Sequence, residues 1–208
     1  MPSSVDLSQI ESDVRDELDS KYTAREAAIR LGRPIIQASS KAIRALHRNE
    51  RDTARDLMDE AKGLVDQLRT ALDGHDDLAR SALSYDAVKE YAEAELTAAL
   101  LAHEPLPSPA DLGIHAVPYL KGLGEAVGEQ RRRLLDQLRK GDLDGAESTF
   151  EDMEVVHDLL TSLDYPDGMT AGLRRTTDVA RALIERSRAD LTTTIVQERL
   201  RVQLEAGS

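Results

Sequence analysis

Two glutamates lie three residues apart in the segment KEYAEAEL, residues 89–96. Residues at i and i+3 are neighbours on a helix, so the carboxylates of Glu90 and Glu93 can converge. The pattern around them is apolar on both sides of a helix, which predicts an interior position. Two buried carboxylates repel each other unless a cation or a shared proton compensates, and Mg²⁺ or Mn²⁺ suits such oxygen ligands. The alternative interpretation is that both glutamates are solvated, or paired with Lys89 or a distant arginine.

A second acidic pair, Glu125 and Glu129, lies four residues apart in VPYLKGLGEAVGEQRRR, residues 117–133. Helical periodicity places both on the side away from the apolar seam, in a ladder with Lys121 and Arg133. Such a ladder is typical of an exposed helix, where each ion pair contributes about 0.2–0.5 kcal/mol. Three glycines in the same helix are harder to explain on an exposed helix, because each costs about 1 kcal/mol relative to alanine, and they indicate that another backbone or a ligand approaches closely. These are Gly122, Gly124 and Gly128. The periodicity by itself still favours the exposed ladder.

Basic residues gather at three places where nucleic acid could bind. The candidate contacts are Arg131, Arg132 and Arg133 in the first patch, and Lys41, Arg44 and Arg48, with His47 and Arg51 beside them, in the second. The third patch holds Arg174, Arg175 and Arg181. Arg131 falls on the apolar seam of its helix and is expected to find a partner there. The net charge of −12 argues against broad, nonspecific binding to nucleic acid, and an aromatic content of 3% argues against base-specific stacking. The same acidic composition suits a protein adapted to high salt.

Composition excludes several other classes of protein. The chain has no cysteine, so disulfides, thiolate zinc sites and cysteine nucleophiles are excluded. No apolar run is long enough to span a membrane, and MPSSVDLSQIESD does not resemble a signal peptide. We therefore expect a cytoplasmic protein.

Helical spacing appears along almost the whole chain, and strand alternation is nearly absent. The pattern predicts one long kinked helix, or two stacked ones, that ends near His47, with Ser4 as an N-cap. Further helices are expected over about 51–73, 77–103, 116–140, up to Leu163, and 170–205. Helices of this length with short loops predict an all-α antiparallel bundle of six or seven long helices, in one domain over residues 1–208.

Two motifs resemble those of a known family. EYAEA at 90–94 and PYLKGLGEAVGEQRR at 118–132 resemble the translin family. The closer likeness is to translin-associated factor X, with its E-Y-x-E-A and D-Y-L-x-G-x-x-D-L-T-G-E-L-x-R motifs. The resemblance implies a seven-helix fold that assembles into a hollow octamer and binds single-stranded RNA or DNA. It also implies a Mg²⁺-dependent endoribonuclease that uses clustered acids.

When the family's motifs are matched to this sequence position by position, they assign metal binding and catalysis to four glutamates: Glu90, Glu93, Glu125 and Glu129. Arg132 matches the closing arginine of the second motif. Glu125 stands where the family usually has aspartate and is one methylene longer. Val127 replaces a threonine and Pro118 an aspartate, and the chain has no counterpart of translin's basic segment before Glu90.

Three functions remain open at this point. The first is a metal-dependent endoribonuclease with Mg²⁺ or Mn²⁺ held by the four glutamates. The second is a non-catalytic oligomer that binds nucleic acid, and the third is a helical scaffold. The four carboxylates favour the first, because binding alone gains nothing from acids that face phosphate. The expected partners are single-stranded RNA or DNA, further copies of the chain, and a second translin-family subunit.

Overall fold

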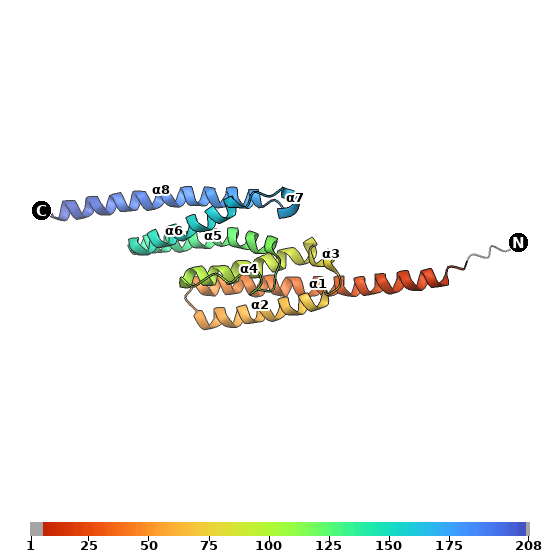
Figure 1. Cartoon of the computed structure of the whole chain (residues 1–208). Helices are drawn as coiled ribbons and strands as arrows, with labels where there is room; N and C mark the ends of the chain where they lie inside the picture. The colour runs from red at the N-terminus through yellow and green to blue at the C-terminus, as the bar shows by residue number, and fades with distance from the viewer. Residues whose placement is uncertain (1–5, 207–208) are drawn as a thin grey trace.

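A computed structural model describes residues 6–206 and shows an all-α chain (Figure 1). Within these residues it has six long helices, two single-turn helices and no strand, which confirms the predicted fold class. The long helices are α1 (Ser8–His47), α2 (Arg51–Ala71), α4 (Ala82–Ala102), α5 (Ala116–Lys140), α6 (Leu143–Ser162) and α8 (Leu173–Ala206). The short ones are α3 (Asp76–Ala79) and α7 (Asp167–Thr170). Ser4, the expected cap, lies outside the described residues.

The helices form a stack in which α4 and α5 are the middle elements. α1 packs against α2 and α4, α4 packs against α5, and α5 packs against α6 and α8. Long helices that follow one another along the chain run in opposite directions, except α4 and α5, which run in the same direction because residues 103–115 return along the bundle between them (Figure 1). The two acidic motifs therefore lie on adjacent parallel helices.

Two of the expected helices are interrupted. The helix expected over 77–103 breaks between α3 and α4, where Ser81 has an extended backbone. The hydroxyls of Ser81 and Ser84 donate to the carbonyl of Leu78, at 2.7 and 2.9 Å, and so satisfy the end of α3. The helix expected over 170–205 breaks at Ala171 and Gly172, whose φ angles of 47° and 73° end α7 in the left-handed region. By contrast, α1 continues as one helix through Pro34.

The core depends on small and aliphatic side chains, and α4 lies at its centre. α4 buries residues on more than one side, including Ala87, Tyr91, Ala92, Ala94 and Leu96. This confirms the predicted interior position of the first acidic motif. At the other extreme, the first part of α1 projects beyond the bundle (Figure 1), and its buried residues begin only at Ala24. None of the helices described is long and apolar enough to cross a membrane.

Candidate metal and nucleic-acid site

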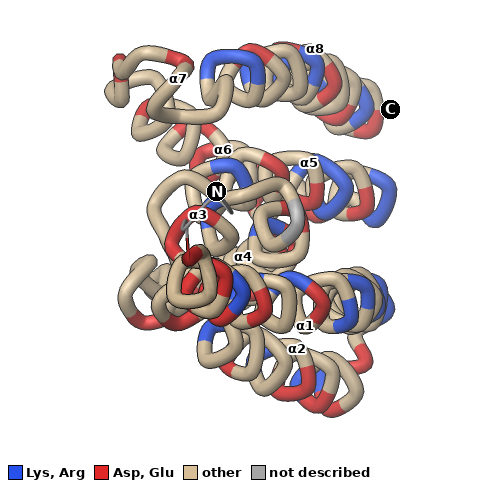
Figure 2. Tube along the Cα trace, turned by 90° about the vertical axis from the view of Figure 1, so that its right-hand side faces the viewer, with Lys and Arg blue, Asp and Glu red and all other residues tan. Residues whose placement is uncertain are grey.

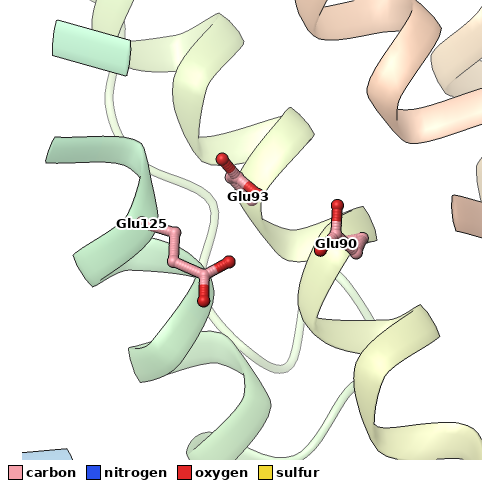
Figure 3. Close-up of side chains that lie close together, drawn as sticks. All are labelled: Glu90, Glu93 and Glu125. Carbon is pink, nitrogen blue, oxygen red and sulfur yellow. The ribbon is translucent and has the colours of Figure 1, made fainter. Parts of the chain in front are cut away.

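Three of the four predicted glutamates come together between α4 and α5. Glu90 and Glu93 extend from α4, and Glu125 extends from α5 with its carboxylate directed toward α4 (Figure 3). One carboxylate oxygen from each lies within 4.8 Å of the others. The side chain of Glu90 is 25% exposed and that of Glu125 is 40% exposed, so the cluster is open to solvent on one side. The extra methylene of Glu125 does not keep it from joining the cluster.

Lys89 supplies the positive charge inside this cluster. Its ammonium donates a hydrogen bond to Glu125 and lies 3.1 Å from Oε1 of Glu90, and its side chain is only 15% exposed. Burial alone would lower the pKa of Lys89, but the hydrogen bonds to Glu125 and Glu90 raise it above the ordinary value. Lys89 therefore carries its charge at neutral pH and neutralises part of the cluster. The pairing of Glu90 with Lys89, which we considered as an alternative to a metal site, is thus present in the structure.

Glu93 is the least solvated acid of the three. Burial raises the pKa of its carboxyl to about 8, and the negative charges of Glu90, Glu125 and Glu129 add to the effect. A carboxyl with this pKa is mostly protonated at neutral pH. Lys89 thus pairs with two acids of the cluster and a proton neutralises the third, unless a divalent ion replaces both.

Gly122 allows α4 and α5 to approach closely at the cluster. A Cβ at this position would lie 2.8 Å from both the amide nitrogen of Glu93 and the carbonyl oxygen of Lys89. The close helix contact indicated by the glycines is therefore present at Gly122. The other two have different surroundings: Gly124 faces Thr176 of α8, and a Cβ on Gly128 would meet only Cδ1 of Leu183, at 3.8 Å. No close contact among the described residues requires a glycine at position 128.

The predicted ion-pair ladder along α5 is wrong, because Lys121 and Glu125 pair with other helices. Lys121 donates to the carbonyl of Gly172 and the hydroxyl of Thr176, at 3.1 and 2.9 Å, and so ties α5 to the start of α8. Glu125 pairs with Lys89. Helical spacing alone cannot reveal partners that come from a neighbouring helix.

Glu129, the fourth predicted acid, lies beside the cluster rather than in it. It pairs with His47 at the end of α1 and lies 3.9 Å from Nη1 of Arg132. The hydrogen bond from His47 lowers the pKa of Glu129, so this carboxylate stays ionised. His47, 3% exposed, belongs to the predicted basic patch of α1, but its pairing with Glu129 was not predicted. The spacing of Lys41, Arg44 and His47 places His47 with the basic residues of α1, but its acidic partner is 82 residues away.

Comparison with known proteins supports the resemblance. No family model matches the sequence. The uncharacterized protein MJ0175 of Methanocaldococcus jannaschii is 26% identical over 189 residues, which cover 90% of this chain and 83% of MJ0175. Among solved structures, AfC3PO, a translin-like protein, is 29% identical with a TM-score of 0.81, over 89% of this chain and 97% of AfC3PO. The resemblance to the translin family is confirmed.

Two further C3PO structures match over similar lengths. A complex of AfC3PO with duplex RNA is 28% identical with a TM-score of 0.79, over 89% of this chain and 96% of that one. NeC3PO, in its apo form, is 20% identical with a TM-score of 0.73, over 93% and 98% of the two chains. At that identity NeC3PO supports the shared fold alone.

Two of the predicted basic patches of this C3PO-like chain meet at Glu129. Arg132 extends from α5, and His47 connects the same carboxylate to the basic residues of α1. Figure 2 shows Lys and Arg positions of α1 and α5 along the same side of the bundle. Lys41, Arg44 and Arg48 line a groove of about 450 Å³ between α1 and α2, together with the acids Asp56 and Glu60.

Arg131 is placed differently from the other predicted nucleic-acid contacts. Its guanidinium donates to the hydroxyl of Ser187 and to Asp190, both at 2.8 Å, and its side chain is 19% exposed. These two contacts supply the partners that were expected for an arginine on the apolar seam of α5. Because its donors bind α8, Arg131 holds α5 to α8 and is removed from the candidate nucleic-acid contacts. Arg132 and Arg133 remain exposed.

The three clustered carboxylates of the C3PO-like fold suit a divalent ion. Mg²⁺ takes oxygen ligands at about 2.0–2.1 Å, so two oxygens on one ion lie at most about 4.2 Å apart. The three oxygens lie within 4.8 Å of one another, so the side chains need to close by at most about 0.6 Å, which rotamer adjustment can supply. Binding would also require Glu93 to release its proton. Glu90, Glu93 and Glu125 could therefore hold Mg²⁺ or Mn²⁺, with Glu129 next to them.

Proposed function

We propose that this chain binds RNA and cuts it as a metal-dependent endoribonuclease in the cytoplasm. The observation that carries the proposal is the convergence of Glu90, Glu93 and Glu125 from two helices of a C3PO-like fold. A bound Mg²⁺ would stabilise charge on the phosphate and lower the pKa of the attacking water. In this proposal Glu129, held ionised by His47, orients the attacking water. The RNA backbone is bound on either side of Glu129, by Arg132 and Arg133 of α5 and by the basic residues of α1.

Cleavage of labelled RNA tests the enzyme directly. We expect Glu90→Gln and Glu125→Gln each to lower the cleavage rate by more than about 100-fold, since even residues behind metal ligands commonly cost 10–100-fold. The measurement is electrophoresis of fluorescent RNA after incubation with Mg²⁺, Mn²⁺ or EDTA, at low and high salt. Glu147→Gln, an exposed acid on α6, is the matched control. Cleavage that persists in both site variants would contradict the assignment.

The strandedness of the substrate is part of the same experiment. The sequence motifs imply single-stranded RNA or DNA, whereas one AfC3PO structure contains duplex RNA. We propose single-stranded RNA as the substrate, with backbone contacts from arginine rather than base stacking, because the chain has few aromatic residues. Single-stranded and duplex forms of one labelled sequence, compared for binding and for cleavage, decide between them.

A non-catalytic nucleic-acid-binding protein is the second candidate function. The observation in its favour is Lys89, which already pairs with two of the three clustered acids. In that case the acids would form a structural ion-pair network between α4 and α5. Binding of RNA without cleavage in either Mg²⁺ or Mn²⁺ would support this second function.

We further propose that copies of the chain assemble through the projecting part of α1. Four apolar side chains there are exposed at steps of four residues, which places them along one side of the helix: Ile10, Val14, Leu18 and Tyr22. At the opposite end of the molecule, α8 exposes Val196, Leu200 and Val202. Exposed stripes of this kind mark interaction surfaces. The sequence motifs imply an octamer and a second translin-family subunit. We propose both, because the exposed stripes of α1 and α8 offer surfaces to further subunits.

A charge placed on the α1 stripe should disrupt the assembly. We expect Leu18→Glu combined with Tyr22→Glu to reduce the molar mass measured by light scattering, with little change in the folding of the monomer because both side chains are exposed. Val155→Glu, at an exposed apolar position on α6, is the control and should leave the mass unchanged. An unchanged mass in the α1 variant would show that this stripe is not the interface. The mass of the unmutated protein gives the subunit number.

A further inference from the structure

Lys89 lies where a divalent ion would have to bind. Its ammonium contacts Glu125 on α5 and Glu90 on α4, which are two of the three carboxylates in the cluster. An ion shared by the three acids would need an oxygen of each at about 2.1 Å. The same oxygens cannot serve the ammonium and the ion at once, because the two cations repel each other at such distances. A metal can bind all three acids only if Lys89 moves.

In the described part of the chain, a hydroxyl without a partner lies one turn before Lys89 on α4. The hydroxyl oxygen of Tyr85 is buried and has no hydrogen-bond partner among the described residues. Tyr85 and Lys89 are four residues apart and so lie on the same side of the helix, where long side chains lean toward the N-terminus. Burial raises the pKa of Tyr85, and the charges of Lys89 and Glu125 also act on this phenol, which places it next to the cluster.

We propose that Lys89 is a tethered cation that competes with the divalent ion for Glu90 and Glu125, and that it moves to the hydroxyl of Tyr85 when the ion binds. This inference rests on the proposed metal site. It assigns Lys89 and Tyr85 as positioning residues that set the metal affinity. It also explains why an otherwise unpartnered phenol oxygen is buried beside the cluster.

The competition has a measurable consequence for affinity. If the ion binds only to molecules in which Lys89 has left the acids, its apparent affinity is the intrinsic affinity multiplied by the fraction of such molecules. Removing the ammonium removes the competitor and its repulsion of the ion, so the variant Lys89→Gln should bind the ion more tightly. A residue whose only role is to hold α4 to α5 would give the opposite result, because its loss would loosen the site.

Calorimetric titration with MnCl₂, without RNA, tests the first part of the inference. We expect Lys89→Gln to bind Mn²⁺ at least about tenfold more tightly than the unmutated chain. Lys140→Gln, which removes the same charge from an exposed position at the end of α5, should leave the affinity unchanged. Lys89→Met repeats the test with an apolar side chain if the glutamine variant folds poorly. Equal or weaker binding in the Lys89 variants overturns the proposal.

A double-mutant cycle tests the role of Tyr85. Tyr85→Phe removes only the hydroxyl, and we expect it to weaken Mn²⁺ binding severalfold because Lys89 loses its second position. In the Lys89→Gln background the same substitution should have no effect, since no ammonium needs the hydroxyl. An equal loss in both backgrounds would mean that Tyr85 acts on the site independently of Lys89, which overturns this part.

The outcomes separate this inference from the proposed function. Tighter Mn²⁺ binding by Lys89→Gln without RNA cleavage supports the inference and contradicts the endoribonuclease. Cleavage by the unmutated chain together with no gain in affinity contradicts the inference alone. The absence of Mn²⁺ binding in every variant contradicts both.

Discussion

Replacing Glu93 by glutamine should stabilise the metal-free protein at pH 8. The pKa of Glu93 is about 8 in the folded chain, because of burial and the neighbouring acids, against an ordinary value of 4.5. Below pH 4.5 the carboxyl is protonated in both the folded and the unfolded chain, and the free energy of unfolding is unaffected. As the pH rises toward 8 the unfolded chain releases this proton first, so the free energy of unfolding falls, by up to about 4 kcal/mol. Glutamine does not ionise, so the variant does not lose this part of its free energy of unfolding as the pH rises.

Urea denaturation between pH 5 and pH 9, in the presence of EDTA, measures this effect. We expect the two proteins to have similar stability at pH 5, and the Glu93→Gln variant to be more stable by a few kcal/mol at pH 8–9. Glu147→Gln, at an exposed position on α6, should follow the unmutated chain at every pH. Added Mg²⁺ should reverse the order at pH 8, because only the carboxylate can bind the ion. Parallel stability curves for Glu93→Gln and the unmutated chain would show that Glu93 is ionised at neutral pH.

The fold could be predicted because helical periodicity is a local property of the sequence. The apolar pattern on both sides of residues 82–102 predicts an interior α4, and Tyr91 and Ala92 are indeed buried there. The breaks after α3 and after α7 were missed. They depend on hydroxyl groups that bond to carbonyls and on two residues with positive φ, which a periodicity of apolar residues does not reveal.

The site could be predicted only in part, because its partners come from different helices. The convergence of Glu90 and Glu93 follows from their spacing, and the family motif adds Glu125. Nothing in the spacing of α5 indicates that Lys89 pairs with Glu125 or that His47 pairs with Glu129. Each of these contacts depends on how the parallel pair of α4 and α5 and the end of α1 are placed side by side. Such placement is a property of the packed bundle, not of one helix.

Gly122 fixes the distance between those helices, and its substitution should show this. A Cβ at this position would lie 2.8 Å from two backbone atoms of α4, which cannot rotate away as a side chain can. We expect Gly122→Ala to force α5 away from α4 and to lower the free energy of unfolding by about 1–3 kcal/mol, the usual range for overpacking. The improved helix propensity of alanine would offset up to about 1 kcal/mol of that loss.

The displacement should also affect the metal site, because the atoms that would clash belong to Lys89 and Glu93 themselves. Moving α5 outward separates Glu125 from Glu93, so Gly122→Ala should bind Mn²⁺ at least about tenfold more weakly, as other disturbances around metal ligands do. Gly128→Ala is the matched control on the same helix: its Cβ would meet only Leu183, at 3.8 Å, and it should gain up to about 1 kcal/mol with unchanged metal affinity. Urea denaturation and calorimetry measure the two effects. If both variants gained stability and bound Mn²⁺ equally, the close contact of α4 and α5 at Gly122 would not be what holds the three carboxylates together.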